Sequence, residues 1–214
     1  MKKVFAIIMS VVLLLGLTSC EQKEGEYDGT WAINQISSTL NKSIKRGVTL
    51  KNLQLVTEIS KDVMYPQDPP TQILSNYEAI VKNSDSFKNL KFSYRAFYAD
   101  GRVDEVENQT SYKGFYLNVF YPCIQHNEIH PKRIKKIKVK RDDNLTKYII
   151  TYKDTHYSRR YEWEYAKVLE DHEVFVIDED GIIVDYQAIT EWEKDGIKHT
   201  SDLRAKVISY ELFD

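Results

Sequence analysis

The chain has 214 residues, of which 42% are hydrophobic, so it is long and apolar enough to bury the core of one ordinary domain. Its 30 Lys and Arg against 32 Asp and Glu give a formal net charge of −2, which argues against a nucleic-acid-binding protein. The chain has two cysteines, Cys20 and Cys123. If the thiol of Cys20 is modified, Cys123 has no partner and an intrachain disulfide is excluded.

Residues 1–19 have the three-part layout of a secretory signal peptide. A basic start of two lysines precedes an apolar centre over residues 4–17, and the small residue Ser19 ends the segment. The apolar centre is shorter than the roughly 20 residues that a membrane-spanning helix needs. The sequence therefore predicts a signal peptide that is removed from the mature protein.

The segment Leu17-Thr18-Ser19-Cys20 resembles the lipobox of bacterial lipoproteins. In that family a diacylglyceryl group is attached to the cysteine thiol, the peptide is cut just before the cysteine, and the new amino terminus is usually acylated as well. The resemblance implies that Cys20 is the lipidated first residue of the mature protein. Because two or more acyl chains hold a protein firmly, we expect a domain that is tethered to the outer membrane and not embedded in it.

The residues behind Cys20 read Glu-Gln-Lys-Glu-Gly-Glu, a polar segment that cannot form a core. We expect a flexible spacer over residues 20–26, followed by a single β-rich domain over residues 27–214. The spacer is similar to the acidic export signal of surface lipoproteins of the Bacteroidota, although Gly25 interrupts the acidic residues. This resemblance implies a surface-exposed protein, and a periplasm-facing lipoprotein is the alternative.

Gly29-Thr30-Trp31 stands just ahead of a strand-like segment and resembles the Gly-x-Trp signature that opens the first strand of lipocalins. The resemblance implies that the tryptophan closes one end of an eight-stranded barrel, that Arg204 packs over it, and that the cavity holds a small apolar ligand. Aromatic side chains would line that cavity, such as Phe92, Tyr94 and Phe115. The alternative is a tryptophan that anchors a β-rich core of another kind.

One short helix is predicted over residues 71–82, directly after two prolines. Ile73, Tyr77 and Ile80 recur there at helical spacing. This helix would interrupt the early strands of the domain.

Most of the remaining chain shows the period-two alternation of half-buried strands. Between Leu90 and Tyr98, apolar residues alternate with polar ones, so one face of this strand would be buried and the other wet. Three Asp-Gly pairs supply the positive backbone angles of tight hairpins, at Asp100-Gly101, Asp180-Gly181 and Asp195-Gly196. Further strands are predicted over residues 110–121, 133–141, 147–153, 157–168, 174–177, 182–190 and 203–212. This pattern predicts a mainly β fold, an antiparallel meander that forms a barrel or a sandwich.

Cys123, His126 and His130, with Glu128 between the histidines, come nearest to a metal site. A structural zinc site usually has four ligands, and this spacing is not the His-Glu-x-x-His of metalloproteases. We therefore expect a solvated loop here, and no metal or other cofactor.

The densest charge run covers residues 132–141. As a strand, it would place three lysines on one face, Lys136, Lys138 and Lys140. We expect a solvated face that is balanced by an acidic neighbouring strand, with Glu162 and Glu164 as the candidates. The alternative is contact with an anionic surface such as lipopolysaccharide, a polysaccharide or an acidic protein.

The sequence has no Gly-x-Ser-x-Gly motif, no Gly-rich phosphate loop and no dinucleotide-binding fingerprint. We therefore predict no catalytic residue, and a membrane-tethered protein that binds a partner protein or a glycan. A lipocalin-like carrier or sensor of a small apolar ligand and a hydrolase of envelope material are the two alternatives. Cys20 is the one site residue that the sequence identifies.

Replacing the lipidated residue tests the anchor. The substitution Cys20→Ala removes the thiol that would carry the diacylglyceryl group, so we expect the protein to move from the membrane fraction to the soluble fraction of the cell. Cys123→Ala is the matched control, and we expect that protein to stay with the membranes. A Cys20→Ala protein that still sediments with the membranes would contradict the lipobox.

Overall fold

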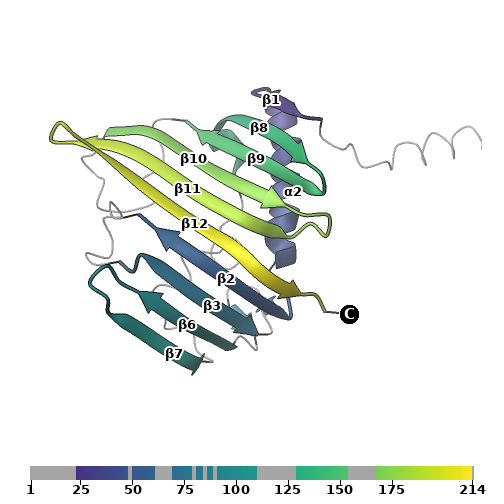
Figure 1. Cartoon of the computed structure of the whole chain (residues 1–214). Helices are drawn as coiled ribbons and strands as arrows, with labels where there is room; N and C mark the ends of the chain where they lie inside the picture. Colours follow the sequence, from purple (N-terminus) through teal and green to yellow (C-terminus); the bar gives the residue numbers. More distant parts are fainter. Residues whose placement is uncertain are drawn as a thin grey trace, which may run out of the picture.

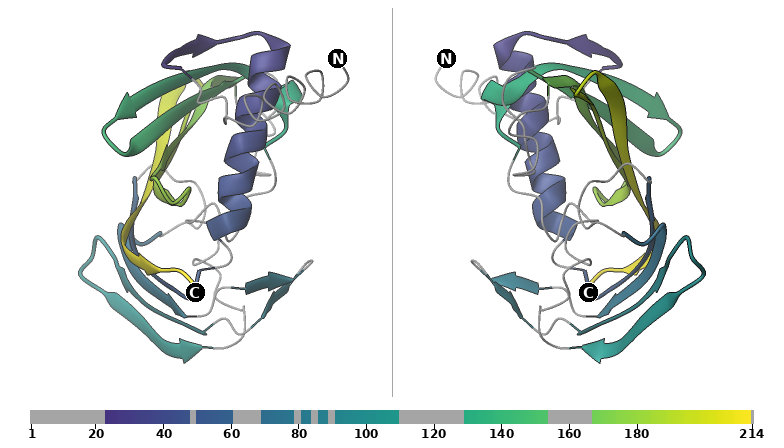
Figure 2. Two further views of the ribbon diagram at one scale, coloured as in Figure 1. Left: turned by 90° about the vertical axis from the view of Figure 1, so that its right-hand side faces the viewer. Right: turned by 90° about the vertical axis from the view of Figure 1, so that its left-hand side faces the viewer.

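A computed structural model describes residues 23–47, 50–60, 69–78, 81–83, 86–88, 91–109, 129–153 and 167–213. These residues form one ten-stranded antiparallel sheet, one α-helix, a short 3-10 turn and a separate two-stranded hairpin (Figure 1). The sheet is strongly curved, and the helix lies against its concave face (Figure 2). The predicted mainly β, antiparallel class is confirmed, and the sheet is open, with β1 and β7 at its two edges.

Strands β8 to β12 follow one another across the sheet, as the predicted meander requires, and the order continues from β12 to β2, β3, β6 and β7. β1 pairs with β8, and β4 and β5 form the separate hairpin. The strands have these bounds: β1 Gly25–Tyr27, β2 Asn52–Ile59, β3 Gln72–Glu78, β4 Val81–Asn83, β5 Ser86–Lys88, β6 Lys91–Phe97, β7 Val103–Gln109, β8 Ile134–Asp142, β9 Leu145–Tyr152, β10 Lys167–Ile177, β11 Ile183–Lys194 and β12 Ile197–Glu211.

The predicted strands that fall within the described residues are present. The strand predicted between Leu90 and Tyr98 is β6, and five more overlap β8 to β12: 133–141, 147–153, 174–177, 182–190 and 203–212. Residues 110–121 lie outside the described residues, and so do residues 157–166, whereas residues 167 and 168 begin β10. β1 begins at Gly25, inside the range predicted as a spacer.

The Asp-Gly pairs form tight turns where the sequence predicted them. Gly101, Gly181 and Gly196 have φ angles of 86°, 76° and 76°, in the left-handed region that glycine adopts without strain. The first two close their turns with main-chain hydrogen bonds to Tyr98 and Asp178. These turns fix the register of the hairpins on either side.

The prediction of a helix over residues 71–82 is wrong. Most of this segment forms β3, and its last two residues begin β4. Ile73 and Tyr77 are four residues apart, a spacing that fits one face of a helix and also one face of a strand. In β3 both side chains are buried, and so is Ser75 between them. Because Ser75 is polar, the sequence did not reveal the alternation.

The helix of the described chain is α2 (Thr30–Gly47), a segment that was predicted to begin as a strand. Its buried residues recur every three or four positions: Ile33, Ile36, Ser37, Leu40, Ser43, Ile44 and Gly47. The helix contains seven Ser, Thr and Asn residues, which have low helix propensity. Packing of the buried stripe against the sheet, and not intrinsic preference, therefore stabilises α2.

A side-chain amide ties α2 to the chain that enters β8. Asn41 accepts a hydrogen bond from the main-chain N–H of Ile129 at 2.8 Å and donates one to the main-chain carbonyl of Ile129 at 3.2 Å.

Within the described ranges, no helix has the length and apolarity that crossing a membrane requires.

A buried carboxylate lies on the concave side of the C-terminal strands. Glu173 on β10 is 1% exposed. Its carboxylate oxygens accept hydrogen bonds from Tyr152 on β9 and from Tyr186 on β11, the second at 2.5 Å. Burial of a carboxylate is costly unless it is hydrogen-bonded, so the two hydroxyls stabilise it there. This cluster ties three neighbouring strands together.

Removal of one hydroxyl tests this role. Tyr186→Phe removes the hydrogen bond that the Tyr186 hydroxyl donates to Glu173 Oε1, so we expect the free energy of unfolding in urea to fall by about 1.5–3 kcal/mol. Tyr148→Phe is the control, because Tyr148 is also buried on the concave face but makes no side-chain hydrogen bond among the described residues. Equal losses in the two variants would show that the hydroxyls do not stabilise Glu173.

Candidate functional site

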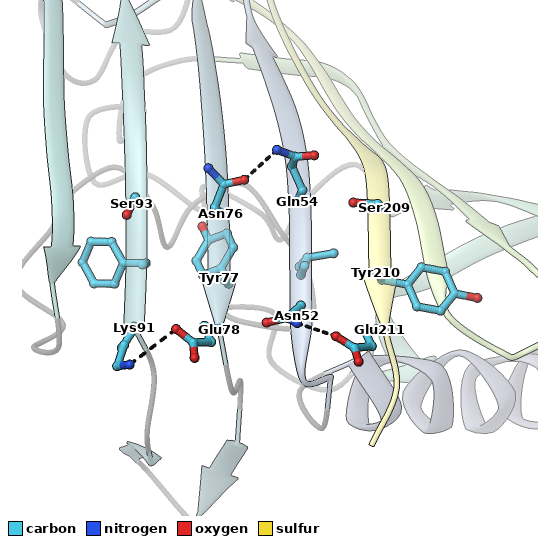
Figure 3. A pocket seen from close by; sticks show the side chains of 12 residues that line it. Asn52, Gln54, Asn76, Tyr77, Glu78, Lys91, Ser93, Ser209, Tyr210 and Glu211 are labelled. Atoms are coloured by element: carbon cyan, nitrogen blue, oxygen red, sulfur yellow. Dashed lines mark hydrogen bonds and ion pairs between the residues drawn. The ribbon is translucent and has the colours of Figure 1, made fainter. Parts of the chain in front are cut away.

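A pocket of about 460 Å³ opens on the convex face of the sheet, across β12, β2, β3 and β6 (Figure 3). We call it the polar groove. Each strand contributes three consecutive residues to its lining: Asn52, Leu53 and Gln54; Asn76, Tyr77 and Glu78; Lys91, Phe92 and Ser93; Ser209, Tyr210 and Glu211. Its volume falls in the range of about 300–1,000 Å³ that is usual for ligand sites.

The antiparallel register arranges the polar side chains of the groove in two rows across the four strands. The first row consists of Glu211, Asn52, Glu78 and Lys91. The second row consists of Ser209, Gln54, Asn76 and Ser93. Because neighbouring strands lie about 4.8 Å apart, each row is roughly 14 Å long.

A row of core residues fixes the polar groove in place. Leu53, Tyr77 and Phe92 are paired in register on β2, β3 and β6, and all three are buried. Since successive side chains of a strand point to opposite faces, burial of this row directs both polar rows toward solvent. A register slip of one residue would bury the amides and expose the aromatic rings.

The first row carries charges that are held by ion pairs. Glu211 accepts hydrogen bonds from Lys51 Nζ at 2.7 Å and from Asn52 Nδ2 at 2.5 Å, and Lys91 Nζ lies 3.5 Å from Glu78 Oε2. The hydrogen bonds from Lys51 and then Asn52 lower the pKa of Glu211 below its usual value. This carboxylate is therefore ionised at neutral pH, which suits it to accept hydrogen bonds and not to act as a general acid.

The second row is uncharged. Gln54 Nε2 donates a hydrogen bond to Asn76 Oδ1 at 2.8 Å, and a serine stands at either end of the row. A primary amide has one acceptor oxygen and two N–H donors, so this single bond leaves the Gln54 carbonyl and the Asn76 amino group able to bind a ligand. The row therefore presents donors and acceptors side by side.

Tyr210 bounds the polar groove on β12, but its ring points away from the other lining residues (Figure 3). Its hydroxyl lies 2.7 Å from a carboxylate oxygen of Asp178 and 2.8 Å from one of Asp180. Burial, together with these two hydrogen bonds, raises the pKa of Tyr210 above its usual value. The neutral hydroxyl joins the end of β12 to the turn between β10 and β11.

The pair of residues implied by the lipocalin resemblance does not form. Trp31 lies in the first turn of α2 and is 72% exposed. Arg204 on β12 instead donates to Asp185 from Nη2 at 2.5 Å and from Nε at 3.2 Å, and this hydrogen bonding raises its pKa. The expected contact is wrong because Gly29-Thr30-Trp31 opens a helix and not a strand.

Of the other residues singled out in the sequence, some lie within the described part of the chain and the rest lie outside it. Phe92 is buried on the concave face and Tyr94 is partly buried against the same core, whereas Phe115 lies outside the described residues. Outside them too lie Cys20, Cys123, His126 and Glu128. His130 is described, directly before the 3-10 turn Pro131–Arg133. The described segments hold no group of three or more His, Cys, Asp or Glu that could bind a metal ion.

Sequence reasoning missed the polar groove. The alternation in Asn52-Leu53-Gln54-Leu55 could have identified β2 as a half-buried strand. The groove, however, depends on pairing β2 with β12, where Asn52 and Glu211 are 159 positions apart. A single sequence carries no signal for such a pairing.

Comparison with known proteins gives no family assignment. No protein-family model matches the chain, and no curated protein matches it. Among solved structures, the chain is similar to LprF from Mycobacterium bovis, with 7% identity and a TM-score of 0.38 over 85% of this chain and 95% of that chain. A TM-score of this size supports no statement about shared fold or function.

A titration tests the electrostatics of the first row. Lys51→Gln removes the charge that most stabilises the ionised form of Glu211, so we expect the pKa of Glu211 to rise toward its usual value. The carboxyl carbon shift of Glu211, followed by NMR against pH, measures this change. Lys91→Gln is the control, since Lys91 pairs with Glu78. A Glu211 titration that is the same in wild type and Lys51→Gln would contradict the assigned hydrogen bond.

Proposed function

We propose that this protein is an envelope lipoprotein, anchored to the outer membrane through Cys20, that binds a glycan in the polar groove. The observation that carries the proposal is the second row, where adjacent amides and serines lie across four hydrogen-bonded strands. Each sugar hydroxyl can donate one hydrogen bond and accept others, so a surface with alternating donors and acceptors is complementary to a saccharide.

The shape of the polar groove favours a chain-like ligand. The groove lies on the face of the sheet and extends over roughly 14 Å, which lets a polysaccharide cross it without a free end. Its apolar lining residues Leu53 and Phe92 are buried on the other side of the sheet, so the side chains that point into the groove are polar or charged. This favours the glycan over the lipocalin-like carrier.

The same site gives little support to a hydrolase. The two carboxylates of the first row, Glu78 and Glu211, are paired with lysines, and the pKa of Glu211 is lowered. Glycosidases need one carboxylic acid whose pKa is raised, so that it can protonate the leaving group. We therefore infer recognition of the glycan without its cleavage.

An array of bacterial surface polysaccharides tests this function. We expect the wild-type domain to bind at least one of them. The double variant Gln54→Ala/Asn76→Ala should bind it about 5- to 150-fold more weakly, because two amides each contribute about 0.5–1.5 kcal/mol. Asn34→Ala/Gln35→Ala is the matched control, since it removes the same two side-chain types from the exposed face of α2. Binding that is equal in all three proteins would exclude the polar groove as the site.

A further inference from the structure

Positive charge is concentrated at one edge of the sheet. Residues 23–27 and 129–153, which comprise β1, β8, β9 and their flanks, contain ten Lys and Arg against four Asp and Glu. The rest of the chain from Cys20 onward has 18 against 28. The edge is therefore basic although the mature chain as a whole is acidic.

Three exposed lysines form the centre of this edge, Lys138 and Lys140 on β8 and Lys147 on β9. Their neighbours in sequence, Val139 and Tyr148, are buried, so the three side chains share the convex face. Lys140 and Lys147 are direct partners in the β8–β9 register. Like charges placed opposite each other destabilise a sheet, so an anion that binds both lysines from outside the sheet would relieve their repulsion.

The neighbouring strands only partly neutralise the edge. Glu26 on β1 lies 3.3 Å from Lys136 Nζ, and Glu24 accepts the main-chain N–H of Arg141 at 2.6 Å. The expected acidic neighbours, Glu162 and Glu164, lie outside the described residues. Among the described residues no carboxylate forms an ion pair with Lys138, Lys140 or Lys147.

The chain leads from this edge to the proposed anchor. Cys20 precedes Gly25, the first residue of β1, by five positions, a length that spans at most about 17 Å. β1 is hydrogen-bonded to β8, so a lipidated Cys20 must hold the basic edge close to the membrane surface. Trp31 follows β1 by four residues and is 72% exposed in the first turn of α2. The start of α2 and β1 lie at the same end of the molecule (Figure 2). Tryptophan is favoured at membrane interfaces.

We propose that the domain rests on the membrane through this basic edge, with Lys138, Lys140 and Lys147 on the phosphates of anionic lipid headgroups and Trp31 at the interface. The proposal rests on lipidation of Cys20. Each lysine close to an anionic bilayer strengthens the association about fivefold. The polar groove begins at β12, four strand spacings from β8, so it lies roughly 19 Å along the sheet from the docked edge.

Energy transfer from the protein to the bilayer tests the docked orientation. The full-length protein, lipidated in bacteria, is reconstituted into vesicles of phosphatidylcholine alone or with added phosphatidylglycerol, which contain an acceptor dye on the headgroups. A donor dye is attached to Asn144→Cys, in the exposed β8–β9 turn, in a Cys123→Ser background. A donor at Ala99→Cys, in the exposed turn between β6 and β7, reports on the far end of the sheet. Circular dichroism of each variant confirms that it is folded.

We expect the Asn144→Cys donor to transfer more energy in anionic than in neutral vesicles, and more than the Ala99→Cys donor. K138Q/K140Q/K147Q should lower the ratio of docked to undocked protein about a hundredfold and return the transfer to its value in neutral vesicles. High salt should do the same, because it screens the charges. K194Q/K198Q/K206Q, which removes three lysines from β11 and β12, should leave the transfer unchanged. Trp31→Ala should lower it.

The outcomes separate this proposal from the one on which it rests. Protein that does not float with either kind of vesicle would show that Cys20 carries no anchor, and the proposed function would fail with it. Protein that floats, but transfers energy equally in both vesicles or is unaffected by K138Q/K140Q/K147Q, would overturn the docking surface alone. Lysine-dependent binding to soluble dextran sulfate, without increased transfer on anionic vesicles, would instead assign the edge to an anionic polysaccharide.

Discussion

Alternation of buried and exposed side chains along one continuous antiparallel sheet is the constraint on which the other features depend. α2 packs into the concave face with Ile36 and Leu40, so the strands turn their apolar residues toward it. The same alternation places the amides of Gln54 and Asn76 on the convex face, together with the lysines of β8 and β9. The polar groove and the basic edge are thus both consequences of how the core packs.

The order of the strands separates these two surfaces. β1 and β8 lie at the edge where the chain arrives from Cys20, whereas β2, β3 and β6 lie toward the opposite edge. The intervening strands are tied together by the cluster around Glu173, which links β9, β10 and β11. The cluster therefore lies between the edge that we propose to dock on the membrane and the groove that we propose to bind a glycan.

The parts of the fold that the sequence predicted correctly are those whose partners are close in the chain. β8 to β12 pair with their sequence neighbours, and Gly181 and Gly196 mark turns between them. Residues 71–82 were assigned to a helix because a spacing of four fits both periodicities, and α2 was missed because its stripe includes Ser37 and Ser43. The polar groove requires β2 beside β12, and no local pattern contains that information.

The most direct test of the account is an NMR titration of the protein with the polysaccharide that binds it in the array, with the side-chain amide signals as the readout. We expect the NH₂ signals of Gln54 and Asn76 to shift with a common saturation curve, because these amides would bind the sugar hydroxyls. The NH₂ signals of Asn34 and Gln35 on α2 should not shift. Saturable shifts confined to other amides, or none at the polar groove, would contradict the account.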